Sequence, residues 1–227
     1  MLNRRDRGRR LWFAAGLAAA LVLFVAGLAF AAAPIVGQAD NTFSAPTYTI
    51  DQGEVAPLQV TGGTHNATAN QNGPDGQALF RSPTISGGTT DTQGTQYLGA
   101  GDYPFFCTIH PTTMQATLHV TSAGAPQARP SAQLSVRSKK LAKVSKKGLL
   151  VAITTNTNVA GASLVAKLGK ATIGKIDGLS LAAGEQLAKV KLTKAGKNKL
   201  KGKKKASVKV TATIPFGSPA TAKSKLT

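Results

Sequence analysis

Turn-forming residues recur closely between residues 41 and 122, and no segment there has the pattern of a long amphipathic helix. Glycines interrupt the chain at residues 62–63, 73–76, 87–88 and 99–102. Aspartate accompanies them at residues 73–76 and 99–102, and proline at residues 73–76. The short segments between these interruptions have the composition of strands. This region is therefore predicted to form a small all-β sandwich or barrel.

Six short segments of this region are predicted strands. In the last of them, Ala116, Leu118 and Val120 alternate with polar residues, which indicates one buried face. The predicted strands are Tyr48–Ile50, Val55–Val60, Gln77–Arg81, Gly94–Leu98, Tyr103–Cys107 and Gln115–Thr121.

A second β region follows a small, proline-containing segment at residues 122–131, which we interpret as a linker. Strands are predicted at residues 148–154 and 162–168, and residues 188–193 and 206–214 alternate apolar with lysine or threonine. This pattern favours an antiparallel sheet with a lysine-covered outer face. Residues 193–200 are expected to form a helical turn or two. Residues 132–227 resemble the lysine-rich, Ig-like β modules of exported bacterial proteins, so we expect domains at 40–121 and 132–227.

Charge also divides the chain into unlike parts. Residues 40–122 carry one base, Arg81, against six acids, a net charge of −5. Residues 123–227 carry 22 bases against Asp177 and Glu185, a net charge of +20. If the chain is exported, physiological nucleic acid is not an expected partner of the basic module. Anionic cell-wall polymers, lipid headgroups or an acidic redox partner fit better, and a merely solvated face is an equal alternative.

The N-terminus has the pattern of an export signal. Five arginines within residues 1–10 precede an uncharged, mainly apolar run from Leu11 to Val36. Ala29–Ala31 offers a cleavage site, but the run is also long enough to span a bilayer, which takes roughly 20 apolar residues. We expect residues 1–36 to be a signal peptide or a membrane anchor, so that the rest of the chain is extracytoplasmic, either secreted or anchored.

Rare residue types cluster in the segment that follows residue 103. Cys107 is the chain's only cysteine, and Met114 is its only methionine after the initiator. Together with His110 they offer soft sulfur donors and an imidazole, the ligand types that select copper. A trigonal copper site needs a second histidine. His65, in a glycine-flanked loop, is a better candidate than His119, which the strand pattern places on an outward face.

The sequence around these residues resembles the cupredoxins of the plastocyanin, amicyanin and pseudoazurin group over residues 40–121. That family has an early histidine, usually followed by asparagine, and a late tyrosine–phenylalanine–cysteine–histidine–proline–methionine pattern. The aromatic-rich strand that often precedes the first histidine is missing here. The matching residues are His65, Asn66, Tyr103, Phe105, Cys107, His110, Pro111 and Met114.

The resemblance implies a Greek-key β-sandwich with a type 1 copper site that holds one Cu(I)/Cu(II) ion. Cys107, as thiolate, would form the short copper bond. His65 and His110 would complete a trigonal plane, and Met114 would be the distant axial ligand. The exposed edge of His110 would be the route by which electrons leave.

Neighbouring residues would support this site. Asn66 would join the two ligand loops by hydrogen bonding, and Phe105, Phe106 and Pro111 would keep water from the metal. The expected function is transfer of single electrons between redox protein partners, without enzymatic activity.

Three other functions compete with this prediction. A copper carrier or resistance protein usually has exposed clusters of methionine or histidine, which this sequence lacks. A copper enzyme needs further histidines, and only His119 remains once His65 and His110 are assigned. A cell-surface binding module with an incidental copper site is the third alternative, supported by the lysine-rich region.

Overall fold

The computed structural model describes residues 32–227, which form one compact unit. Most of the proposed leader lies outside these residues. Its last five residues, 32–36, are described. Two of them, Ile35 and Val36, lie in strand β1 (Ile35–Gly37), and Ile35 is completely buried. The fold thus begins earlier than residue 40, where the sequence suggested that it would. Among residues 32–227, no helix combines the length and the hydropathy needed to cross a bilayer.

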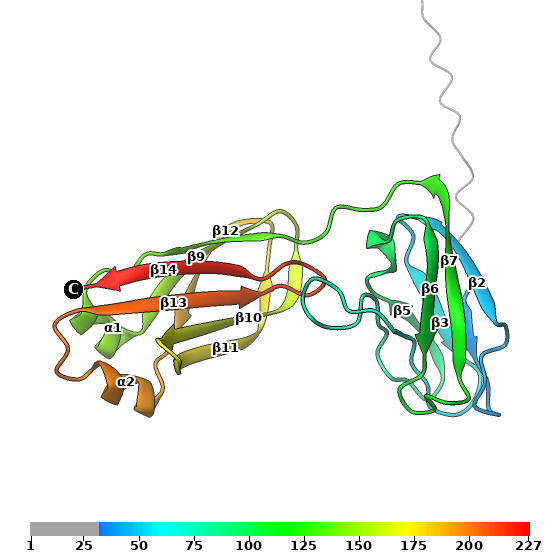
Figure 1. Ribbon diagram of the computed structural model, residues 1–227, viewed down its shortest axis with the longest axis horizontal. Helices are drawn as coiled ribbons and strands as arrows, with labels where there is room; N and C mark the ends of the chain where they lie inside the picture. Colours follow the sequence, from blue (N-terminus) through cyan, green and yellow to red (C-terminus); the bar gives the residue numbers. More distant parts are fainter. Residues whose placement is uncertain (1–31) are drawn as a thin grey trace, which may run out of the picture. The chain divides into compact units, whose positions relative to one another are not determined.

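Residues 35–124 form two sheets that share one hydrophobic core (Figure 1). One sheet has the order β1-β3-β5, and the other has the order β2-β7-β6-β4. Strands β1 and β3 run parallel, as do β2 and β7, while the other neighbours are antiparallel. The remaining strands are β2 (Thr47–Gln52), β3 (Ala56–Val60), β4 (Thr68–Ala69), β5 (Gly88–Thr92), β6 (Gly101–Phe106) and β7 (Gln115–Gly124).

Four of the six strands expected here are confirmed, and two are wrong. Residues 77–81 make only isolated bridges, from Ala78 to Asn72 and from Arg81 to Thr68 and Gln93. Residues 95–97 form a 3₁₀ turn, η1 (Thr95–Tyr97), instead of a strand. The physical reason is local: Gly94 adopts a left-handed backbone, with φ of 104°, and its N–H donates to the side chain of Gln96. The polar side chains thus favour a turn over a ladder.

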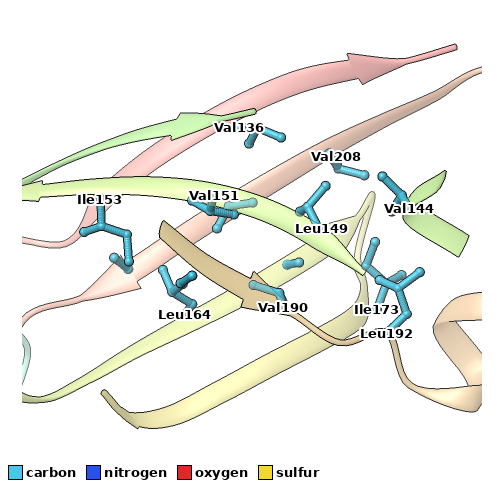
Figure 2. Close-up of a cluster of buried hydrophobic side chains, with 14 of the residues drawn as sticks. Val136, Val144, Leu149, Val151, Ile153, Leu164, Ile173, Val190, Leu192 and Val208 are labelled. Carbon is cyan, nitrogen blue, oxygen red and sulfur yellow. The ribbon is translucent and has the colours of Figure 1, made fainter. Parts of the chain in front are cut away.

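Residues 132–226 form a second pair of sheets, with the orders β12-β9-β8 and β11-β10-β13-β14. Figure 2 shows side chains from both sheets and from α1 converging on one core, which contains Val151, Leu164 and Val208. The elements are β8 (Ala132–Val136), α1 (Leu141–Lys147), β9 (Leu149–Thr155), β10 (Val159–Leu168), β11 (Ala171–Leu181), β12 (Gly184–Val190), α2 (Lys194–Leu200), β13 (Ala206–Thr213) and β14 (Ala220–Leu226).

The all-β class is therefore confirmed, with both helices short. The helical turn expected at residues 193–200 is present as α2, because the Thr193 side chain accepts a hydrogen bond from the N–H of Gly196 and caps the helix. Residues 125–131 contain neither helix nor strand. The division into separate domains and the Ig-like character of the second pair of sheets stay predictions.

Candidate metal centre

Three of the four predicted donors lie in the loop that joins β6 to β7. Backbone hydrogen bonds between these donors close the loop on itself. The N–H of Cys107 donates to the carbonyl of Met114 at 3.0 Å, the N–H of His110 to the carbonyl of Cys107 at 3.2 Å, and the N–H of Met114 to the carbonyl of His110 at 3.0 Å. Because β6 and β7 pair along their length, the loop is anchored at both ends.

His65 reaches the same place from another segment of the chain. Its N–H and carbonyl both bond to Ile85 at 3.0 Å, which fixes its backbone. Two glycines make room for its ring. A Cβ on Gly63, whose φ is +76°, would lie 2.7 Å from His65 Nε2. A Cβ on Gly37 would lie 3.0 Å from His65 Cδ2 and 3.1 Å from Met114 Cε. Any larger residue at either position would crowd the donors.

The donor atoms have the separations that one metal ion requires. Cys107 Sγ lies 4.0 Å from His65 Nδ1 and 3.9 Å from His110 Nδ1, and all three atoms lie within 4.8 Å of one another. A metal bond of about 2.3 Å to sulfur and about 2.0 Å to nitrogen, meeting at 120°, would place the two donors about 3.7 Å apart. The three residues therefore fit around a single ion, and the cluster can hold a metal.

A hydrogen bond selects the tautomer of the neutral His65 ring. Its Nε2 lies 2.9 Å from the carbonyl oxygen of Gln38. Because a carbonyl only accepts hydrogen bonds, Nε2 must carry the proton, and Nδ1 keeps a free lone pair on the side of Cys107. The histidine is thus held in the tautomer that a metal needs. Sequence reasoning missed Gln38, and a backbone carbonyl leaves no signal in the side-chain pattern that could have revealed it.

Burial separates the donors into two groups. His65, Cys107 and Met114 are all 0% exposed, whereas His110 is partly exposed. Ile109, next to His110, is 50% exposed and is one of two large hydrophobic side chains exposed in the described chain. The cluster thus meets solvent through His110 alone among the four predicted donors.

Asn66 connects the two ligand-bearing segments. Its Oδ1 accepts from the N–H of Thr108 at 2.9 Å, and its Nδ2 donates to the hydroxyls of Thr108 at 2.7 Å and Thr84 at 2.8 Å. Thr108 follows Cys107, and Asn66 follows His65, so this amide joins the neighbours of two donors. Both threonines were missed from the sequence, where Thr108 was only a spacer between cysteine and histidine.

The other predicted supporting residues lie in different surroundings. Phe105 is completely buried, and its ring lies 4.9 Å from that of Phe43. Phe106 and Pro111 line a shallow surface hollow of about 310 Å³. His119 lies on the outer face of β7, as expected, where its Nδ1 is 2.6 Å from a carboxylate oxygen of Asp102.

Comparisons with known proteins add little to this geometry. No protein-family model and no curated protein matches the chain. Among solved structures, a reduced Cu(I) mutant of amicyanin at pH 4 is 22% identical, with a TM-score of 0.30, over 40% of this chain and 86% of that one. An oxidized amicyanin mutant is 25% identical, with a TM-score of 0.28, over 40% and 90%. A protocadherin gammaB7 fragment is 11% identical, with a TM-score of 0.23, over 81% and 45%.

Proposed function

We propose that this protein is an exported type 1 copper protein that carries single electrons between redox partner proteins. One observation carries the proposal: two imidazole nitrogens, one of them from a histidine 42 residues before the cysteine, lie 4.0 and 3.9 Å from the thiol sulfur of Cys107. Soft sulfur donors combined with imidazoles favour copper over hard cations. The soft thioether of Met114, buried beside His65, extends the same donor set.

Each donor has a distinct role in this proposal. A bound copper ion would supply a reversible one-electron change between Cu(I) and Cu(II). Cys107, as thiolate, is the strongest donor. His65 and His110 complete the plane, and Met114 is the more distant fourth ligand. The hydrogen bonds around the loop and through Asn66 hold the donors in one arrangement. A fixed arrangement suits both oxidation states, so little needs to move when an electron is transferred.

His110 is the proposed contact point for redox partners. It is the one partly exposed donor, and the neighbouring Ile109 offers apolar surface beside it. A partner that docked there would approach the metal through a single imidazole ring. This role needs no substrate and no general acid or base, so we propose no enzymatic activity. The proposed site of action is outside the cytoplasm, and this part rests on the sequence of the leader.

The test is to add Cu(II) to the purified chain and record the visible spectrum. We expect an intense thiolate-to-copper band that disappears on reduction. Cys107→Ser and His65→Gln should remove the band or strongly alter it. His119→Gln is the matched control, because this third histidine lies outside the cluster, and it should leave the band unchanged. A band that is unaltered in His65→Gln would refute the proposed ligand set.

A second measurement separates an electron shuttle from a copper carrier. A reversible copper couple with rapid electron self-exchange, measured by line broadening in nuclear magnetic resonance, supports the shuttle. Ready loss of copper to a competing chelator, with slow self-exchange, would instead favour a carrier that delivers or sequesters the metal.

A further inference from the structure

All 20 lysines of the chain lie at or after residue 139, and all of them are exposed. Three of them form a row across one sheet. Lys167 of β10 pairs directly with Lys209 of β13, and Lys209 pairs directly with Lys223 of β14. Directly opposed residues on neighbouring strands have Cβ atoms only about 4.5–5.5 Å apart. The row therefore concentrates three positive charges on one face.

This arrangement is unfavourable for the module by itself. Like charges directly opposite each other in a sheet destabilise it. Within residues 32–227, the only ion pair between a lysine and a carboxylate joins Lys175 to Asp177, so no acidic side chain neutralises the row. The compensation for this charge must come from outside the module, either from dissolved counterions or from a negatively charged partner.

The row continues into two hollows near the end of the same sheet. One hollow, of about 380 Å³, is lined by Lys205, Ser207 and Lys225. Because side chains alternate along a strand, Ser207 and Lys225 share the outer face with Lys209 and Lys223, and Lys205 immediately precedes β13. The second hollow, of about 340 Å³, is lined by Lys201, Lys203 and Lys204 together with residues of α1. Thr227 lines both hollows, so they are adjacent.

We propose that these lysines bind a flexible, linear polymer whose charges are phosphate groups in its backbone. We call the surface the lysine track. It consists of Lys167, Lys201, Lys203, Lys204, Lys205, Lys209, Lys223 and Lys225. The track lies on β10, β13, β14 and the segment between α2 and β13, and it does not depend on the proposed copper function.

The residue types on the track favour phosphates on a mobile chain. Every basic residue of the track is lysine, which acts as a compact point charge on a flexible stem. Arginine, whose planar fork recognises an anion in one fixed geometry, is absent from the track. Lysine can instead follow phosphates that shift position. Such binding releases counterions and is steeply dependent on salt.

Two other classes of polyanion fit less well. A bilayer surface is usually bound with the help of inserted apolar side chains, but the exposed large hydrophobics of residues 32–227 are Ile109 and Leu187, and neither belongs to the track. Single-stranded nucleic acid is bound by stacking its bases on aromatic rings. Phe216 is the only aromatic residue after residue 131, and it does not line either hollow. The polymer is thus expected to lack bases.

The test measures binding of the purified full chain to long-chain inorganic polyphosphate, as a function of salt. The track variant is Lys167→Gln/Lys209→Gln/Lys223→Gln. The matched control is Lys189→Gln/Lys191→Gln/Lys194→Gln, which removes the same charge from residues outside the track. We expect the track variant to lower the slope of log K against log salt by about 2–3, and the control to lower it by less than about 1. Circular dichroism checks that both variants are folded.

Parallel titrations use phosphatidylglycerol vesicles and a single-stranded oligonucleotide at equal phosphate concentration. The leader is identical in all variants, so the difference between wild type and track variant isolates the lysines. We expect that difference to be largest for polyphosphate. If the two triple variants lost polyphosphate binding equally, the effect would depend on net charge alone, and the proposal would be overturned. A larger track-dependent effect with vesicles, or at least tenfold tighter binding of the oligonucleotide, would overturn it in favour of a membrane or a nucleic acid.

Discussion

At the scale of single residues, the candidate site combines donors that the sequence reveals with backbone features that it hides. His65, Cys107 and His110 stand out because these residue types are rare in the chain, and His119 could be set aside from the alternation of its strand. The carbonyl of Gln38 and the bare Cα of Gly37 carry no comparable signal, since they act through position and not through side-chain chemistry. Sequence reasoning therefore finds ligands more readily than it finds what orients them.

Gly37→Ala should perturb the site without touching any donor. The added methyl group would lie 3.0 Å from the His65 ring and 3.1 Å from the Met114 methyl, so both side chains must shift. We expect copper affinity to fall about tenfold and the visible band to move, as is typical when the surroundings of a ligand are changed. Gly99→Ala is the control, because its nearest neighbour is 3.9 Å away. An unchanged spectrum and affinity in Gly37→Ala would contradict this.

Asn66→Ala should destabilise the protein even without metal. The substitution removes three hydrogen bonds to Thr108 and Thr84. At about 1 kcal/mol each, the free energy of unfolding of the metal-free protein should fall by about 2–3 kcal/mol, measured by urea denaturation. The exposed Asn70 serves as control, since Asn70→Ala should change stability by less than about 0.5 kcal/mol. A loss as small as that of the control would show that the amide does not join the two segments.

At the scale of strands and turns, the sequence is informative where apolar and polar residues alternate. Such alternation correctly located β7 and β13, whose buried and exposed residues follow period two. Strand β5 escaped notice because its sequence, GTTDT, contains no apolar residue, and only Thr92 is buried. It exists because β3 supplies a pairing edge, which is a tertiary effect. The strand predicted at residues 94–98 is the opposite error. Its composition favoured a strand, but local hydrogen bonds stabilise a turn there.

The lysine row of β10, β13 and β14 predicts a stabilising charge reversal. In Lys209→Glu, a carboxylate would face Lys167 and Lys223 directly. The free energy of unfolding should rise by about 0.5–1 kcal/mol at low salt, and the gain should shrink as salt screens the charges. Lys189→Glu provides the comparison, because the residue opposite Lys189 is Leu150. If both variants gained equally, the effect would reflect net charge and not the row.

At the scale of the whole molecule, contacts within residues 32–227 bury the carboxylate of Asp75. The side chain of Asp75 is 1% exposed. Burial alone would raise its pKa, but the N–H groups of Phe216 and Gln77 and the Arg81 guanidinium stabilise the charged form and hold the pKa below its usual value of 3.8. Arg81, the only basic residue among residues 40–122, thus pairs with the buried carboxylate of Asp75.

Asp75 predicts a loss of stability in acid. Because its pKa is lower in the folded than in the unfolded chain, its contribution is complete above the unfolded value and is lost as pH falls through the folded value. Asp75→Asn should therefore cost about 1–3 kcal/mol at pH 7, because Arg81 loses its charged partner, and much less near pH 2. Urea denaturation at both pH values gives the comparison, with the exposed Asp91→Asn as control. A cost that is independent of pH would exclude a charged Asp75.

Strand β7 has a consequence for how the two proposed activities can coexist. It begins one residue after Met114 and ends at Gly124, where the chain leaves for the basic region. Ten residues of strand span about 33 Å, so the candidate metal donors of the β6–β7 loop and the last residue of β7 lie at opposite ends of one strand. A partner that docked at His110 would therefore approach the end of this pair of sheets that is remote from the segment leading to the lysines.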